Sequence, residues 1–257
     1  MPLPNFPNKH RGTVLLTAED VIAHQRKYGH LKEPPEIDAG IICLKAGLPE
    51  RMKRKFPIRR AGHYLGDLYL LKGRITKIAV LANFGFGAPV VASLAEELIA
   101  LGAKQIVSIS HAGSLQQGLK SGNLIVCDEA IRDEGTSHHY LPPDKSVKND
   151  SMLSLQVLER LGKAATKGPV WSTDAPFRET REEVAQYQKE GVLAVDMEAA
   201  ALMAVGQVRG VATAIILVVG DDLSQFEWKP PTDMEAIEEA FEMGYSAAIS
   251  VLDQPTT

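Results

Sequence analysis

The chain has 257 residues, of which 45% are hydrophobic, and its formal net charge is −4. This length and composition allow a sizeable hydrophobic core and exclude an intrinsically disordered protein. The small negative charge leaves no overall footprint for nucleic acid or for an anionic membrane, so neither partner is expected.

The N-terminal stretch lacks the apolar segment of a secretory signal, and no apolar run is long enough to span a bilayer. Cys43 and Cys127 lie in apolar runs typical of strands, which favours reduced, buried thiols over a disulfide framework. We therefore expect a cytoplasmic protein without a membrane-spanning segment.

From about residue 40 onward, β-rich runs alternate with helical patterns. The predicted strands cover 40–46, 77–83, 104–110, 123–131, 168–173, 191–197 and 213–220. The predicted helices, with apolar residues three and four apart, cover 88–103, 154–165, 178–191, 198–210 and 232–253. This alternation predicts an α/β fold, a single three-layer domain whose mixed, mostly parallel central sheet is covered by helices on both faces. We assign residues 36–257 to this domain and residues 1–35 to an N-terminal extension.

In open α/β sheets, ligands bind beyond the carboxyl ends of the strands. In this chain those ends are rich in Gly, Ser, Thr and acidic residues. They read "KAGLPER", "ANFGFGAP", "SISHAGS", "STDAPFRET", "VDMEAA" and "VVGDDLS". The sequence therefore predicts a ligand site at this edge of the sheet.

Three other motifs do not indicate a specific function. "GFGAPV" (85–90) has Val90 where a dinucleotide-binding turn has its third glycine, so a tight turn is favoured. The adjacent His138 and His139 are interpreted as surface or interface residues, and no metal site is predicted. "RMKRKFPIRR" (51–60) carries six basic residues in ten and is equally compatible with a solvated helix end and an anion site.

Two acidic residues, Asp196 and Glu198, interrupt the apolar run "LAVDMEAAALMAV" (193–205). Burying an unpaired carboxylate costs roughly several kcal/mol, so each one needs a partner. On an extended chain both would share one face, whereas at a helix start Asp196 becomes the N-cap, and we favour capping for Asp196. Glu198 opens an apolar helix, and its carboxylate can accept two hydrogen bonds from a vicinal diol such as that of ribose. Asp221, in "VVGDDLS", fits either an ordinary turn or a proton donor to a leaving group.

Together these segments resemble the nucleoside phosphorylase family that contains uridine phosphorylase and the hexameric bacterial purine nucleoside phosphorylases. The resemblance covers about residues 30 to 250, with four segments in the family's order: 96–113, 131–143, 172–180 and 190–202. It implies that inorganic phosphate attacks the anomeric carbon of a nucleoside and releases a free base and pentose 1-phosphate. The implied transition state is oxocarbenium-like, and neither a metal nor an organic cofactor is required.

The resemblance also implies residue roles at the sugar and at the phosphate. Glu198 should accept the ribose 2′- and 3′-hydroxyls, with Met197 packed on the sugar and His30 reaching the 5′-hydroxyl across a dimer. The implied phosphate-binding residues are Gly47, Arg51, His111 and, lent by a neighbouring subunit, Arg60.

At the base, the resemblance implies contacts from Pro176, Phe177 and Gly113. Asp221 falls where the purine enzymes keep the acid that protonates the purine N7. The glutamine and arginine that read uracil are replaced by Thr180 and Glu182, which favours a purine over a pyrimidine. A homo-oligomer built from dimers, with a hexamer as the expected size, and a role in nucleoside salvage or catabolism follow from the same resemblance.

One segment departs from the family. Ser108 stands in place of a phosphate-binding arginine, Ser110 in place of a glycine and His111 in place of a phosphate-binding hydroxyl. Losing a bidentate arginine costs a phosphate site about a few kcal/mol, which a protonated His111 would offset.

Three hypotheses follow from this departure. A phosphorylase with a rebuilt anion pocket is favoured, since Arg51 and Arg60 are retained, with a pyrimidine nucleoside as the alternative substrate. A hydrolytic nucleosidase on the same fold and a catalytically weak nucleoside-binding protein are the other two.

Overall fold

The computed structural model describes residues 4–28, 35–63, 65–149 and 151–254. Within these ranges, ten strands form one sheet. The strands are β1 (Ala39–Cys43), β2 (Ile58–His63), β3 (Asp67–Leu71), β4 (Ile78–Ala82), β5 (Gln105–Ser114), β6 (Leu124–Asp133), β7 (Ser146–Lys148), β8 (Ala165–Thr173), β9 (Ala194–Asp196) and β10 (Ala212–Asp222). The α-helices are α1 (Ala18–Lys27), α2 (Leu48–Met52), α3 (Ala88–Ala100), α4 (Ser137–Tyr140), α5 (Met152–Leu161), α6 (Arg181–Lys189), α7 (Ala199–Arg209) and α8 (Met234–Leu252).

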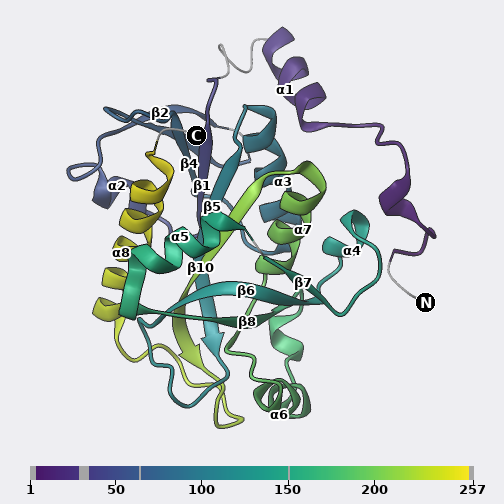
Figure 1. Ribbon diagram of the computed structural model, residues 1–257, viewed down its shortest axis with the longest axis vertical. Coiled ribbons are helices and arrows are strands. Elements are labelled where there is room, and N and C mark those ends of the chain that lie inside the picture. The colour runs from purple at the N-terminus through teal and green to yellow at the C-terminus, as the bar shows by residue number, and fades with distance from the viewer. Residues whose placement is uncertain (1–3, 29–34, 64, 150, 255–257) are drawn as a thin grey trace.

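Helices cover both faces of the sheet, as the periodicity predicts (Figure 1). On one face, α3 and α7 pack together with side chains such as Leu94 and Leu202 in one hydrophobic cluster. On the other face, α5 and α8 pack together with Val157 and Phe241 in a second cluster. The central sheet therefore lies between two apolar layers, which fixes the positions of the strand ends.

The sheet is mixed, and part of it closes on itself. Strands β4, β1, β5 and β10 run parallel to one another, as do β6, β8 and β9. Strand β10 pairs with β5 on one side and antiparallel with β6 on the other, while β9 pairs antiparallel with β5. The strands β5, β10, β6, β8 and β9 therefore form a closed ring, whereas β2, β3 and β4 extend the sheet as an antiparallel edge.

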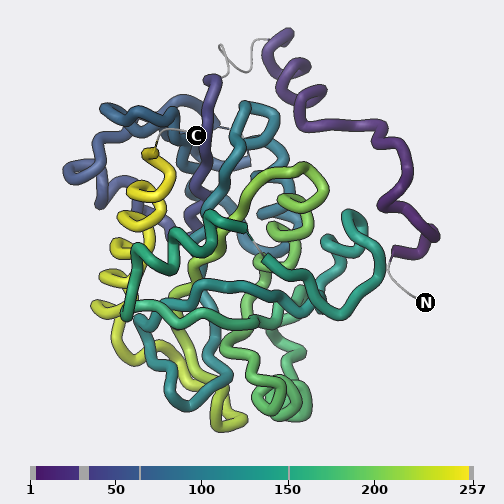
Figure 2. The backbone as a smooth tube through the Cα atoms, in the orientation of Figure 1, coloured from purple at the N-terminus to yellow at the C-terminus, as the bar shows by residue number. Residues whose placement is uncertain are grey.

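The N-terminal segment lies on the outside of the domain, and Figure 2 shows it passing α4 before it reaches α1. Helix α1 packs on α3 through Ile22, which belongs to the same hydrophobic cluster as α3. Thr17 begins α1 with a capping box, because its hydroxyl accepts from the Asp20 N–H and the Asp20 carboxylate accepts from the Thr17 N–H. The boundary between extension and domain near residue 35 stays a prediction.

Each helix predicted after residue 40 is confirmed, with boundaries shifted by a few residues. Each predicted strand is confirmed as well, although β5 extends four residues beyond the predicted end, to Ser114. The sequence did not predict the β2–β3 hairpin, which contains residues 58–60, the last three of the basic run at 51–60. Strand β2 has no clean alternation of buried and exposed residues, and this explains the omission.

Cys43 and Cys127 are both buried and unbridged, as predicted. Among the described helices, none combines the length and the apolar character that crossing a membrane requires.

Candidate functional site

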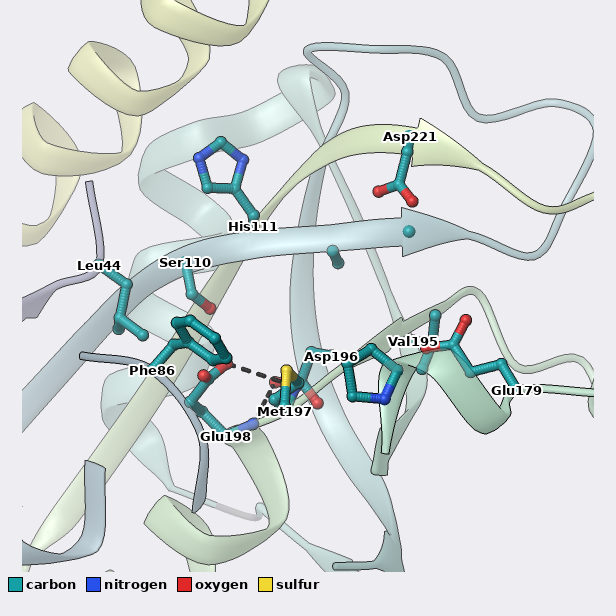
Figure 3. A pocket seen from close by; sticks show the side chains of 13 residues that line it. Leu44, Phe86, Ser110, His111, Glu179, Val195, Asp196, Met197, Glu198 and Asp221 are labelled. Carbon is teal, nitrogen blue, oxygen red and sulfur yellow. Dashed lines mark hydrogen bonds between the residues drawn. The ribbon is translucent and has the colours of Figure 1, made fainter. Parts of the chain in front are cut away.

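A cavity of about 340 Å³ opens where several strands end (Figure 3). Its wall is made by Leu44 after β1, by Phe86 after β4, by residues 110–113 of β5, by residues that follow β8, by the end of β9 and the two residues after it, and by Asp221 near the end of β10. The cavity lies at the carboxyl ends of the strands, which is the edge of the sheet where the sequence predicts a ligand site. Its lining residues are Leu44, Phe86, Ser110, His111, Ala112, Gly113, Pro176, Glu179, Val195, Asp196, Met197, Glu198 and Asp221.

Glu198 is one of two buried acidic residues of the wall, the other being Asp196, and only 5% of its surface is exposed. One carboxylate oxygen accepts a hydrogen bond from the Gly87 N–H at 2.6 Å, and the other accepts from the Met197 N–H at 3.3 Å. Gly87 has a φ of +98°, a conformation that favours glycine, and lies in the predicted 85–90 turn. The glycines of that turn therefore allow its backbone to approach the Glu198 carboxylate.

Asp196 has a structural role, as the sequence favours, but it is the last residue of β9 and the N-cap position of α7 is Glu198. Its carboxylate accepts from the Ala199 N–H at 2.8 Å and the Glu198 N–H at 3.2 Å, which satisfies donors at the start of α7. The Ser172 hydroxyl donates to the other oxygen at 2.5 Å and accepts from the Ala200 N–H at 3.0 Å. These bonds hold the β9–α7 junction and turn the next acidic residue, Glu198, toward the cavity.

Burial, with the nearby Asp196 charge as a smaller cause, raises the pKa of Glu198 from its ordinary 4.5 to about 7. The native state therefore holds this proton more tightly than the unfolded chain does, and the free energy of unfolding falls as pH rises from 4.5 to 7.

Glu198→Gln has no ionisable group at this position and should not lose stability in this way. We expect the unfolding free energy of the variant, relative to that of the wild type, to be about 2 kcal/mol higher at about pH 8 than at about pH 5. Urea unfolding of both proteins at the two pH values measures the change. A difference between the two proteins that stays constant with pH contradicts the raised pKa.

Asp221 lies at the part of the cavity where β10 leaves the ladder with β5. Regular pairing breaks between Val219 and Asp222, and this irregularity turns the Asp221 side chain into the cavity. The Trp228 indole N–H donates to one Asp221 oxygen at 2.8 Å. A Cβ atom on Gly113 would stand 2.6 Å from the Leu223 Cδ1 atom and 3.4 Å from an Asp221 carboxylate oxygen, so the glycine keeps the space beside Asp221 open.

Glu179 is a second carboxyl at this part of the cavity, next to the predicted base contact Pro176. Burial, with the charge of Asp221 as a further cause, raises the pKa of Glu179 to about 7. A carboxyl that titrates near neutral pH can donate or accept a hydrogen bond, which suits recognition of the edge of a heterocyclic base.

His111 and Ser110 lie on opposite sides of β5, with His111 above the strand in Figure 3 and Ser110 below it. The His111 ring contacts the Phe241 ring with 4.5 Å between centroids. His111 is exposed at the cavity surface, and the partial desolvation of its ring, with the Lys45 charge as a smaller cause, lowers its pKa, which favours the neutral imidazole over the protonated form. The buried Ser110 hydroxyl has no hydrogen-bond partner among the described residues and remains available to a ligand.

The predicted phosphate residues of the 45–51 loop lie beside the cavity and do not line it. Gly47 has a φ of +76° and precedes α2. The Arg51 guanidinium pairs with Glu238 and, at 2.7 Å, with Glu242, both on α8. Lys45 also pairs with Glu238, at 2.6 Å. Two carboxylates of α8 therefore neutralise Lys45 and Arg51, and the Lys45 charge acts on His111.

Other predicted residues lie outside the cavity wall. Arg60, on β2, pairs with Asp67 at 2.6 Å, and Phe177 is fully exposed. His30 lies outside the described residues. The structure thus brings together six of the predicted residues, which are Gly113, His111, Pro176, Met197, Glu198 and Asp221.

Sequence reasoning missed four groups that the fold places at or beside the site, namely Phe86, Lys45, Glu179 and Trp228. Phe86, Lys45 and Glu179 lie in strand-end segments predicted to form the site, so their position carried a signal. Trp228 lies seven residues after Asp221, and only the folded hairpin brings its indole to that carboxylate.

The sequence profile described as "Phosphorylase superfamily" matches residues 47–254, which is most of the chain and includes each cavity residue except Leu44. The chain belongs to the phosphorylase superfamily. Among its relatives, guanosine phosphorylase of Halorubrum lacusprofundi is 29% identical over 150 residues, which cover 56% of this chain and 61% of that protein. Uridine phosphorylase of Treponema pallidum is 28% identical over 194 residues, which cover 70% of this chain and 75% of that protein.

A solved structure of the superfamily gives the same fold. The crystal structure of uridine phosphorylase from Vibrio fischeri aligns with a TM-score of 0.70 at 27% identity, covering 87% of this chain and 96% of that one. The superfamily relatives thus include enzymes named for a purine and for a pyrimidine nucleoside.

Proposed function

We propose that this protein is a nucleoside phosphorylase, a pentosyltransferase that converts a nucleoside and phosphate into a free base and pentose 1-phosphate. The observation that carries the proposal is the pair of carboxylates, Glu198 and Asp221, on different walls of one cavity (Figure 3). The superfamily relatives named as guanosine and uridine phosphorylases support the same activity.

At the sugar, the Glu198 carboxylate is the acceptor for the ribose 2′- and 3′-hydroxyls, and Met197 lies beside it in the cavity wall. The two hydroxyls donate to the carboxylate and stabilise its charged form. The Gly87 and Met197 N–H groups hold the carboxylate in place, so its orientation is set before the substrate binds.

At the base, Asp221 is the group that meets the N7 of a purine and neutralises the charge that develops as the glycosidic bond breaks. The Trp228 indole fixes the Asp221 carboxylate, and Gly113 leaves room for a flat ring. We favour a purine because this acid is present and because Thr180 and Glu182 stand where uracil would be read.

At the phosphate, the Ser110 hydroxyl and the neutral His111 imidazole supply hydrogen-bond donors on either side of β5. Lys45 and Arg51 supply positive charge when phosphate replaces the α8 carboxylates as their partner. By the same family resemblance, the enzyme uses no metal or organic cofactor and acts in nucleoside salvage in the cytoplasm. A homo-oligomer built from dimers, with a hexamer as the favoured size, would bring Arg60 and His30 from a neighbouring subunit.

A panel of purine and pyrimidine nucleosides, incubated with and without phosphate, tests the proposal by release of free base. We expect release that depends on phosphate and yields pentose 1-phosphate. The pairing of Lys45 and Arg51 with α8 carboxylates favours a second candidate, a hydrolytic nucleosidase, which predicts equal release without phosphate. Nucleoside binding with no release in either arm contradicts both enzymes.

Glu238→Gln tests the cation site. Because Glu238 competes with phosphate for Lys45 and Arg51, neutralising it should lower the KM for phosphate about threefold to tenfold and change kcat little. Initial rates at varied phosphate measure this, with Glu50→Gln, whose carboxylate pairs with Lys53, as the matched control. An unchanged or raised KM for phosphate in Glu238→Gln removes Lys45 and Arg51 from phosphate binding.

A further inference from the structure

A second cavity of about 610 Å³ adjoins the one described above. The two share Pro176, Glu179 and Asp221, so the carboxylate assigned to the base stands at the boundary between them. We call the second cavity the aromatic chamber, because Phe177, Phe226 and Trp228 line it together with Val184 and Leu223.

The aromatic rings of the chamber are unusually accessible for apolar groups. Phe177 is fully exposed, Trp228 is 61% exposed and Phe226 is 39% exposed. Exposed apolar side chains that gather around a hollow mark a binding surface more often than isolated ones do. The open face of the chamber therefore fits an apolar or aromatic ligand group.

The loop that carries two of these rings is closed by hydrogen bonds and is locally strained. Asp222 and Lys229 exchange two backbone hydrogen bonds, of 3.0 and 2.9 Å, which close the hairpin, and the Gln188 side chain donates to the Ser224 carbonyl. Phe226 has a φ of +61°, a conformation that is costly for a non-glycine residue and that persists where the surroundings hold it. The chain thus keeps a phenylalanine where a glycine would be less strained, which points to a use for its ring.

The positions of the atoms on a purine ring indicate which substituent would reach the aromatic chamber. The N7 atom and the exocyclic group on C6 lie side by side on one edge of a purine. If Asp221 meets N7, a substituent on the C6 nitrogen extends past Asp221. Because Asp221 also lines the chamber, that substituent enters it.

We propose that the aromatic chamber is a subsite for an aromatic or bulky apolar substituent on the C6 nitrogen of the base, so that the enzyme takes N6-substituted purine nucleosides. The inference rests on the proposed function, and it adds a substrate class to it. Stacking against Phe226 and Trp228 supplies the additional affinity.

The probes are N6-benzyladenosine and adenosine, compared by isothermal titration calorimetry without phosphate and by base release with phosphate. We expect the benzyl compound to bind about tenfold more tightly than adenosine and to be cleaved with a higher kcat/KM. Phe226→Gly removes the ring while glycine accepts the φ of +61° without strain, so the loop keeps its shape.

In Phe226→Gly, the benzyl compound should lose about fivefold in affinity and in kcat/KM, while adenosine changes by less than about twofold. Phe6→Gly, which removes another exposed phenylalanine far along the chain from the chamber, should leave both compounds unchanged. If N6-benzyladenosine binds no more tightly than adenosine, or if Phe226→Gly weakens the two equally, the subsite is wrong even when adenosine is cleaved. Tighter, Phe226-dependent binding without cleavage of either compound would leave the subsite standing and overturn the proposed activity.

Discussion

Replacing Glu198 with glutamine is expected to lower kcat/KM for a nucleoside by about 100- to 1,000-fold. Two hydrogen bonds from the ribose diol to a charged acceptor contribute about 1.5–2 kcal/mol each, or about 3–4 kcal/mol together, and the neutral amide of glutamine provides the charged acceptor for neither of them. The buried amide keeps nearly the same volume, and its remaining oxygen can still accept from the Gly87 N–H. Steady-state rates with a ribonucleoside and with its 2′-deoxy analogue measure the effect.

The deoxy analogue separates recognition of the diol from a general loss of structure. In the wild type, removing the 2′-hydroxyl should cost activity, and in Glu198→Gln the same removal should cost much less. Asp196→Ala is the contrasting variant, because it removes the acceptor for the N–H groups of Glu198 and Ala199. We expect it to lower the unfolding free energy by about 2 kcal/mol. An equal loss for both sugars in Glu198→Gln would contradict the role of the diol acceptor.

Replacing Asp221 with asparagine is expected to lower kcat by about 100-fold or more, while the Kd for a purine nucleoside changes by less than about threefold. The asparagine side chain can still accept the Trp228 indole N–H, so the geometry is kept, but it cannot supply a proton to the departing base. Single-turnover cleavage and equilibrium binding measure the two quantities separately.

Asp222→Asn is the matched control for Asp221→Asn. The neighbouring Asp222 does not line the cavity, and its carboxylate accepts from the Ser224 N–H at 2.7 Å, a bond that asparagine can keep. Its kcat should match the wild type. If Asp221→Asn weakens binding as much as it slows cleavage, Asp221 binds the substrate and is not the acid.

Much of the fold could be predicted because its periodic signals are strong. Helix α3 buries Val91, Leu94, Ala95 and Leu98 at three- and four-residue spacing, and Pro89 follows Gly87 at its start. The β2–β3 hairpin was missed because Arg59 and Arg60 are exposed neighbours on an edge strand, which breaks the two-residue alternation. Ring closure through β10 was also missed, since pairing of β10 with two strands depends on contacts remote in sequence.

The part of the candidate site that could be predicted consists of acidic residues that interrupt an apolar segment. Glu198 stood out because a charge in an apolar helix start needs a partner, and Asp196 was assigned as a cap from its place before that helix. The environment of Arg51 could not be predicted, because Glu238 and Glu242 lie more than 180 residues away in the chain. Phe177 was expected against the base, but it lines the aromatic chamber and not the cavity that contains Glu198.

A crystal structure of the protein with a purine nucleoside and phosphate tests the central claim most directly. We predict that both ribose hydroxyl oxygens lie within about 2.5–3.2 Å of the Glu198 carboxylate, and that the phosphate accepts hydrogen bonds from the Ser110 hydroxyl and the His111 imidazole. A complex in which Glu198 bonds only to protein N–H groups, while the sugar occupies some other part of the cavity, would contradict the assignment.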